Sequence, residues 1–358
     1  MTGAGAWLTN WSVAMSIAAC TPPRGSSPQG GGGGKPRLQI PPAGAVYHGV
    51  HAGAAGGYED RVDPAALDAY ESAVGRKVAW VYFSSEWRKS RAFPTETAAW
   101  IHSRGAVPFL RLMLRSSLDV HVVEPLFTLE AIARGDFDDD LRAWADGARA
   151  LGSPVLVEWG TEMNGDWFAW SARWSGDAAP DQFRRAYRRM VRIMAERQAP
   201  LSWVFHIHVP DAEGERFERY WPGDDVVDWT GLSCYGPQTP TQDSWPDFAQ
   251  TLDEYIPRVL ALAPGKPIMV AELGTDVRNP HVDPVRWATQ AFDGLLGNRW
   301  PSVRGFAWWS ESWPNDDRRA NDSELRVDRA PALAAALRGR FATPLLLDRP
   351  ILRVGHGE

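Results

Sequence analysis

The sequence is poor in cysteine, with only Cys20 and Cys234 among 358 residues. Two cysteines provide no disulfide framework, and Cys234, at the end of a predicted strand, is most simply a small buried hydrophobic residue. Hydrophobic residues make up 44% of the chain. A chain of this length and composition can therefore bury a full core without covalent cross-links.

The sequence also has no excess of positive charge, since its formal net charge is -6. Lys and Arg are scattered among Asp and Glu, which leaves no basic stripe for a phosphate backbone and excludes nucleic acid as an expected partner. Residues 47–53 lack the glycine spacing of a dinucleotide-binding turn, and no P-loop occurs. Beyond the N-terminal region no apolar run is long enough to span a bilayer, so we expect the folded part to be soluble.

The N-terminal region differs from the rest. Residues 16–20, ending in Cys20, resemble the lipobox of bacterial lipoproteins, and a Pro/Gly/Ser-rich stretch follows over residues 21–44. We expect residues 1–20 to be a lipoprotein signal, residues 21–44 to be a flexible tether, and the protein to be exported, with a lipid anchor at Cys20. No Lys or Arg precedes the apolar stretch, which departs from the usual signal, so a mere N-terminal tail is the alternative.

From residue 45 onward, short apolar runs alternate with amphipathic stretches, which is typical of repeated strand–helix units. The predicted strands are residues 45–50, 77–84, 106–113, 154–159, 201–206, 229–235, 267–272 and 303–309. The predicted helices are residues 64–75, 95–104, 137–151, 181–197, 248–262, 284–296 and 330–337, with a short piece at 215–220. Eight such units predict an α/β fold, a single-domain (β/α)8 TIM barrel over residues 45–340, followed by a tail over 341–358. A long loop is expected at 115–136.

Two glutamates stand where predicted strands give way to glycine-bearing loops: Glu162 after the fourth strand and Glu272 at the end of the seventh. In a barrel both fall at the carboxyl-terminal face, where active sites lie. Paired carboxyls are what cleavage of a glycosidic bond requires. The chain also has 19 Trp and 8 Tyr, whose flat faces can stack on sugar rings or fill a barrel. Together these features suggest carbohydrate chemistry.

The pattern resembles glycoside hydrolase family 26, which includes β-mannanases. The residues that carry the resemblance are Glu162-Met163-Asn164-Gly165, Trp167, Trp170, Lys266-Pro267, Glu272 and Gly274. The resemblance implies a retaining, endo-acting hydrolase of β-mannan, or in some branches of mixed-linkage β-glucan or β-1,3-xylan. It implies that Glu162 is the acid/base, that Glu272 is the nucleophile and that Tyr235 orients Glu272. The family usually has His directly before its acid/base, where this chain has Thr161, and this departure bears on the choice of substrate.

Substrate contacts are predicted for residues near the ends of the strands. They are Asn164, Trp167, Trp170, His206 and Trp308, the last because one of the paired Trp308 and Trp309 must face the barrel mouth. Retention requires an ionised Glu272 and a raised pKa at Glu162, so that Glu162 can donate a proton. No cofactor or metal is required, and the expected partner is a polysaccharide or oligosaccharide.

Two rival interpretations stay open. His48, His51, His206 and His208 lie at or beyond the first and fifth predicted strands, where some barrel hydrolases hold Zn²⁺, although the His-x-x-His spacing departs from their pattern. The other rival is a non-catalytic glycan-binding protein on a degenerate barrel, which Thr161 alone supports. Chelator sensitivity and turnover of a glycan distinguish the three.

Overall fold

The structure is a computed structural model that describes residues 37–53 and 56–353. The predicted signal at residues 1–20, the anchor at Cys20 and most of the predicted tether lie outside the described residues. Within the described ranges, no helix is both long enough and apolar enough to cross a membrane.

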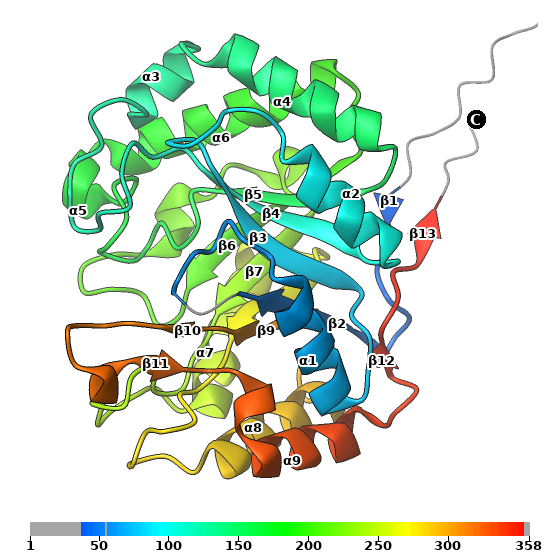
Figure 1. Ribbon diagram of the computed structural model, residues 1–358. Coiled ribbons are helices and arrows are strands. Elements are labelled where there is room, and N and C mark those ends of the chain that lie inside the picture. The colour runs from blue at the N-terminus through cyan, green and yellow to red at the C-terminus, as the bar shows by residue number, and fades with distance from the viewer. Residues whose placement is uncertain (1–36, 54–55, 354–358) are drawn as a thin grey trace, which may run out of the picture.

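Eight parallel strands form a closed barrel (Figure 1). Strands β2 to β9 pair in chain order, and β9 pairs with β2 through six residue pairs from Tyr47–Gly305 to Ala52–Ser310, which closes the ring. The eight are β2 (Val46–Ala52), β3 (Trp80–Glu86), β4 (Val107–Met113), β5 (Val155–Trp159), β6 (Leu201–His208), β7 (Trp229–Ser233), β8 (Ile268–Leu273) and β9 (Val303–Ser310). Each overlaps a predicted strand, so the (β/α)8 prediction is confirmed.

Helices surround the barrel in Figure 1. They are α1 (Pro64–Val74), α2 (Thr95–Ser103), α3 (Leu129–Arg134), α4 (Asp138–Leu151), α5 (Ala172–Ser175), α6 (Ala179–Glu196), α7 (Phe248–Leu262), α8 (Pro284–Leu296) and α9 (Pro331–Phe341). Short 3-10 turns are η1 (Phe217–Tyr220), η2 (Asp224–Val226), η3 (Arg319–Asn321) and η4 (Val327–Arg329). The Asp-Pro signals begin helices as predicted: the Asp63 side chain accepts the amides of Ala65 and Ala66 at the start of α1, and Asp283 does the same for α8.

Alternation along each strand separates two apolar layers. One set of side chains packs between strands and helices, whereas the opposite set fills the barrel, including Tyr82, Phe109, Leu156 and Trp309. The Trp80 ring crosses the barrel floor and leaves no room for a Cβ at Gly49 or at Gly305. The floor is therefore closed, and the chemistry is confined to the opposite end.

Three features differ from the sequence prediction. The loop expected at 115–136 contains helix α3, because Thr128 caps it and apolar residues of α3 pack against α6. The short helix α5 in the loop beyond β5 was not predicted. Strand β1 (Arg37–Leu38) pairs with β13 (Leu352–Arg353), which joins the end of the expected tether to the expected tail; β12 (Leu346–Leu347) adds beside β2.

Candidate active site

A cleft of about 740 Å³ opens at the carboxyl-terminal ends of the strands. Glu162 and Glu272 both line it, and so does Tyr235. The volume lies within the range that ligand pockets usually have. The remaining lining residues are Gly56, Gly57, Glu59, Arg111, Val120, Trp167, Phe168, His208, Gln238, Gln242, Trp309, Glu311, Trp313 and Pro314. The two predicted catalytic carboxyls therefore face one cavity.

Glu272 is the penultimate residue of β8 and is only 5% exposed. The Tyr235 hydroxyl donates to Glu272 Oε2 at 2.8 Å, so the expected contact is present. The Tyr82 hydroxyl donates to Oε1 at 3.2 Å, and the Arg111 guanidinium forms an ion pair with that same oxygen. One cation and two hydroxyls therefore hold the carboxylate in place.

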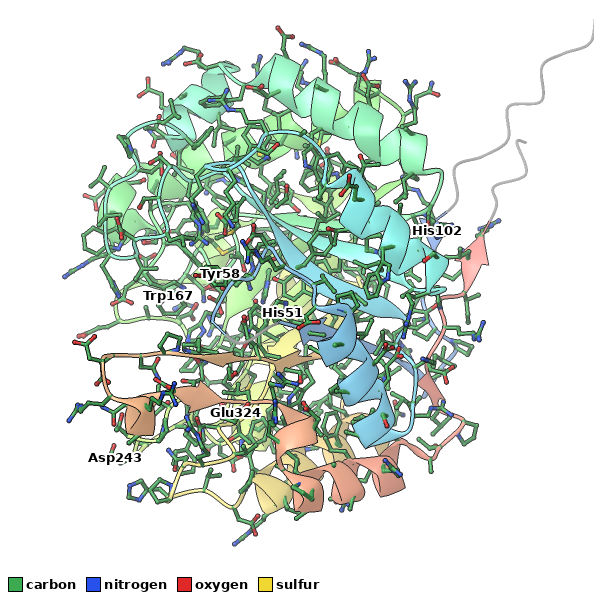
Figure 2. All side chains as sticks on the ribbon, in the orientation of Figure 1. His51, Tyr58, His102, Trp167, Asp243 and Glu324 are labelled. Carbon is green, nitrogen blue, oxygen red and sulfur yellow. The ribbon has the colours of Figure 1, made fainter. Side chains whose placement is uncertain are left out.

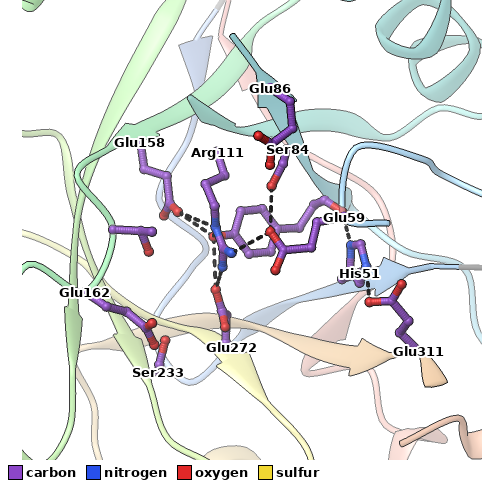
Figure 3. Close-up of polar contacts among 12 residues, drawn as sticks. His51, Glu59, Ser84, Glu86, Arg111, Glu158, Glu162, Ser233, Glu272 and Glu311 are labelled. Atoms are coloured by element: carbon purple, nitrogen blue, oxygen red, sulfur yellow. Dashed lines mark hydrogen bonds and ion pairs between the residues drawn. The ribbon is translucent and has the colours of Figure 1, made fainter. Parts of the chain in front are cut away.

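Arg111 is the buried cation around which this end of the barrel is organised (Figure 3). Besides Glu272, its guanidinium contacts Glu59 Oε2 at 3.0 Å and Glu158 Oε1 at 3.3 Å. Burial disfavours the charge, but the neighbouring Tyr82 and the carboxylates outweigh burial and raise the pKa of Arg111 well above its usual value. Arg111 thus supplies positive charge to three carboxylates at the cleft end of the barrel.

Below the cleft, Glu158 and His206 form a fully buried pair, with Glu158 Oε2 2.7 Å from His206 Nδ1. His206 Nε2 lies 2.8 Å from Ser233 Oγ, and its Nδ1 lies 3.0 Å from the Thr161 hydroxyl. Burial raises the pKa of Glu158, but His206 and Arg111 lower it by more, so the net shift is downward. His206 does not line the cleft, and its predicted substrate contact is replaced by this buried network. The Thr161 hydroxyl belongs to the same buried network, and Thr161 does not line the cleft either.

Glu162 lies just past β5 and adopts a left-handed backbone with φ of 52°. Non-glycine residues rarely occupy this region, and such conformations cluster at functional sites. Its amide donates to the His206 carbonyl, and the residue as a whole is 9% exposed. The Trp167 indole, labelled in Figure 2, donates to Glu162 Oε2 at 3.0 Å, and His208 Nδ1 is 3.5 Å from Oε1. Trp167 therefore contacts the carboxyl as well as lining the cleft.

The expected raised pKa of Glu162 is wrong for the ligand-free protein. Burial of the carboxyl raises the pKa, but the interaction with His208, aided by His206 and Arg111, outweighs burial and lowers the pKa to about 2. The carboxyl is surrounded by donors and cations rather than by the apolar pocket that raises the pKa of a general acid. Glu162 must therefore acquire its proton against this stabilisation when substrate is bound.

Two further predicted substrate contacts are engaged elsewhere. Asn164 is fully buried, and its amide nitrogen donates to the His208 carbonyl and to Asp211 Oδ1, both at 2.7 Å. Trp170 stacks on Phe168 and donates to the Thr161 carbonyl at 2.7 Å, away from the cleft. The hydrogen bonds of both side chains are made within the protein, so both residues order the loop that carries Glu162.

The prediction that Trp308 faces the mouth is wrong. Trp308 is fully buried in the layer between barrel and helices, where its indole donates to the Leu325 carbonyl at 2.9 Å. Its neighbour Trp309 lines the cleft instead, stacked on His51 with ring centroids 4.0 Å apart and with Arg111 5.2 Å from its ring centre. The two rings lie on opposite sides of β9, as strand alternation predicts, and Trp309 is the one that faces the mouth.

The histidines of the metal-hydrolase alternative do not come together. His48 lies on the helix side of β2, where it contacts the Lys77 carbonyl and the Tyr70 hydroxyl, and burial lowers its pKa to about 3. His51 faces the interior and contacts the Tyr82 carbonyl and Glu311. Within residues 37–53 and 56–353, no group of three or more His, Cys, Asp or Glu side chains is arranged to hold a metal ion.

Sequence reasoning did not predict the site residues that surround the two glutamates. They are Glu59, Tyr82, Arg111, Glu158, His208, Trp309 and Glu311. Two had a readable signal, since Arg111 and Glu158 are charged residues inside otherwise apolar strands, where an unpaired charge is costly. Arg111 and Glu158 are direct neighbours in the register of β4 and β5. The others lie on loops or depend on strand register, which the sequence alone does not reveal.

Comparison with known proteins agrees with this architecture. Residues 131–268 match the model of Glycosyl hydrolase family 26. The Bacillus subtilis mannanase BCman has a TM-score of 0.59 and 20% identity over 87% of this chain and 88% of that chain. GH26C from Muricauda sp. MAR_2010_75 has a TM-score of 0.62 and 13% identity over 85% of this chain and 87% of that chain. The family whose model matches residues 131–268 is the one that the sequence resembles, and the solved structures share the barrel fold.

Sequence relatives match smaller portions. A β-1,3-xylanase from Alcaligenes sp is 28% identical over 122 residues, 34% of this chain and 25% of that protein. A mannan endo-1,4-β-mannosidase from Bacillus subtilis strain 168 is 26% identical over 175 residues, 47% of this chain and 43% of that protein. The chain thus spans from a quarter to less than half the length of these relatives. The family match ends before Glu272, whose place in the site rests on the geometry above.

Proposed function

We propose that the protein is a retaining, endo-acting glycoside hydrolase of a β-glycan, with β-mannan as the first choice and mixed-linkage β-glucan or β-1,3-xylan next. One observation carries the proposal: Glu162 and Glu272, from two different strand ends, line the same cleft with different surroundings. Glu272 is paired with Arg111 and Tyr235, which suits a nucleophile. Glu162 lies at the rim, which suits proton exchange with a departing sugar.

The proposed reaction has two steps. A Glu272 oxygen attacks the anomeric carbon while the glycosidic C–O bond breaks, and Glu162 gives its proton to the departing oxygen. Glu162, now ionised, then takes a proton from a water molecule that attacks the same carbon, and the Glu272 carboxylate leaves. Arg111 and Tyr235 stabilise the Glu272 carboxylate before attack and again on release.

The choice of polymer is supported by the relatives named above and by the cleft walls. Trp167, Trp309 and Trp313 line the cleft, and indole faces are suited to the apolar faces of sugar rings. The relatives include enzymes named for β-1,4-mannan and for β-1,3-xylan. Mannan is placed first because solved structures with a similar fold include several that are named as mannanases.

The test is release of reducing sugar from mannan, glucomannan, mixed-linkage glucan, β-1,3-xylan and cellulose, with and without chelator. The proposal is supported if the wild type releases sugar equally with and without chelator and Glu272→Ala releases none. The polymer that is cleaved is then the substrate. Release that stops on chelation favours the metal hydrolase. If mannan in the gel slows the migration of the wild type in affinity electrophoresis, but the wild type releases no sugar from any polymer, the result favours the non-catalytic binding protein.

We also propose export with a lipid anchor at Cys20, supported by the lipobox-like residues 16–20 and the Pro/Gly/Ser-rich stretch that follows. Mass spectrometry of the protein expressed in a bacterial host tests this. Cleavage before Cys20 with an acylated N-terminal cysteine is the expected result, and an unmodified Cys20 inside a longer chain contradicts it.

A further inference from the structure

His208 is the side chain at the cleft whose role the proposed reaction leaves open. It ends β6, lines the cleft and keeps 26% of its side chain exposed. Its Nδ1 is buried and, within the described part of the chain, makes no hydrogen bond; it stands 3.5 Å from Glu162 Oε1. Contacts of catalytic groups are often long in ligand-free proteins and shorten in the complex.

The backbone of His208 is held in register with the loop that carries Glu162. Asn164 accepts the His208 amide at 2.9 Å and donates to the His208 carbonyl at 2.7 Å. The same side chain donates to Asp211, so it has one orientation that satisfies all three contacts. Asn164 therefore ties the strand end with His208 to the loop with Glu162.

The imidazole is also held from the side. The ring of Trp167 meets the His208 ring edge to face, with centroids 4.7 Å apart and planes at 90°. The Trp167 indole donates to Glu162 Oε2, whereas His208 Nδ1 faces Oε1. A different side chain therefore lies against each oxygen of the acid/base. This arrangement fixes the orientation of the Glu162 carboxyl group.

Other charged and titratable groups reach Glu162 only over longer range, because their polar atoms are committed elsewhere. Arg111 on β4 and Tyr235 beyond β7 both bind Glu272. His206 on β6 binds Glu158 and Ser233. His208 is thus the titratable side chain whose ring nitrogen directly faces the carboxyl of Glu162.

We propose that His208 is a positioning residue for the acid/base: its Nδ1 orients the Glu162 carboxyl toward the leaving group and sets the pH range over which Glu162 can donate a proton. This inference rests on the proposed hydrolase function. An Nδ1–H directed at the carboxylate favours the ionised form, in line with the lowered pKa of Glu162. Substrate must weaken this contact for Glu162 to hold its proton.

The test compares His208→Ala and His208→Asn with the wild type on soluble β-1,4-mannan, or on β-1,3-xylan if only that is cleaved. Asparagine places an amide N–H near the position of Nδ1, whereas alanine removes the donor. His281→Ala is the matched control, because His281 is an exposed histidine outside the cleft. The pH dependence of kcat/KM is recorded together with the unfolding midpoint of each variant.

His208→Ala should shift the alkaline limb of the profile to higher pH by about one unit, because Glu162 loses a group that favours its ionised form. On the polymer kcat/KM should fall about tenfold, and on a dinitrophenyl glycoside, whose leaving group needs no proton, by less than about twofold. His208→Asn should return the limb toward the wild type. An unmoved limb in folded His208→Ala, or the same shift in His281→Ala, would overturn the proposal. A wild type without hydrolysis would instead refute the hydrolase function itself.

Discussion

The two carboxyls of the cleft are held in different ways. Glu272 lies at a strand end among contacts from three other strands or their loops: Arg111 from β4, Tyr82 from β3 and Tyr235 beyond β7. Glu162 lies on a loop with a left-handed backbone and is contacted by Trp167 and His208 at the rim. The barrel thus holds one carboxyl by a cation and two hydroxyls, whereas the other is held by an indole and an imidazole.

This difference matches the demands of the proposed reaction. A nucleophile needs one constant protonation state and little freedom to move, and a rigid barrel interior supplies both. An acid/base has to gain and lose a proton in every cycle, which suits a rim position where substrate replaces solvent. The comparison predicts that changes near Glu272 act on charge and stability, while changes near Glu162 act on proton transfer.

The largest effect should come from the two carboxyls themselves. Glu272→Ala should lower activity on the polymer roughly 10⁴-fold, because the attacking oxygen is gone. Glu162→Ala should lower it about 10³-fold yet largely spare formation of the glycosyl-enzyme from a dinitrophenyl glycoside. Added azide should rescue both variants, giving an α-glycosyl azide with Glu272→Ala and a β-glycosyl azide with Glu162→Ala by NMR. The same anomer from both variants would contradict the distinction between the carboxyls.

Loss of the buried cation should be the next largest effect, and it should act on the fold. Arg111→Met leaves Glu59, Glu158 and Glu272 without their shared positive charge and should reduce the free energy of unfolding by about 3–5 kcal/mol. Urea unfolding measures this. The control Arg134→Met removes an exposed ion pair with Asp136 and should leave the midpoint in place. Equal midpoints for both variants would mean that Arg111 is not needed to hold the network together.

Substitution of the neighbouring Trp308 and Trp309 should affect different properties, since Trp308 packs between barrel and helices and Trp309 lines the cleft. Trp308→Ala should cost roughly 3–5 kcal/mol of stability with little change in KM below its melting temperature. Trp309→Ala should raise KM on the polymer about fivefold, because an aromatic face of the cleft is lost. Thermal unfolding and steady-state kinetics of the two variants check this; a KM increase in Trp308→Ala alone would restore the original expectation.

The smallest effect concerns stability in acid. The pKa of Glu158 is lowered in the folded protein, so its contribution is complete above its ordinary value of 4.5 and is lost as the pH falls toward the folded value. Glu158→Gln carries no titrating proton at this position. At pH 7 the urea midpoint of Glu158→Gln should be lower than that of the wild type. Below pH 4.5 the midpoint of the variant should fall less steeply than that of the wild type. Parallel slopes would show that Glu158 has an ordinary pKa in the folded state.

Much of the barrel could be predicted from the sequence because apolar runs and Asp-Pro helix starts are local signals. Glu162 and Glu272 could be placed at the same face because parallel strands share a direction. The roles of Asn164, Trp170 and His206 could not, since whether a polar group meets substrate or protein depends on partners far along the chain, such as Glu158 for His206. For Trp308 a register signal existed: Gly305 and Ala307, the small residues that share the interior face with Trp309, leave room for Trp80.

The central claim is that Glu272 attacks the sugar, and covalent trapping tests it most directly. The wild type is incubated with a dinitrophenyl 2-deoxy-2-fluoro glycoside of the sugar that forms its preferred polymer, then digested and sequenced by mass spectrometry. The account predicts one added glycosyl group on Glu272, absent from Glu272→Ala. A label on Glu162 or Glu311, or turnover of the polymer without any trapped intermediate, would contradict it.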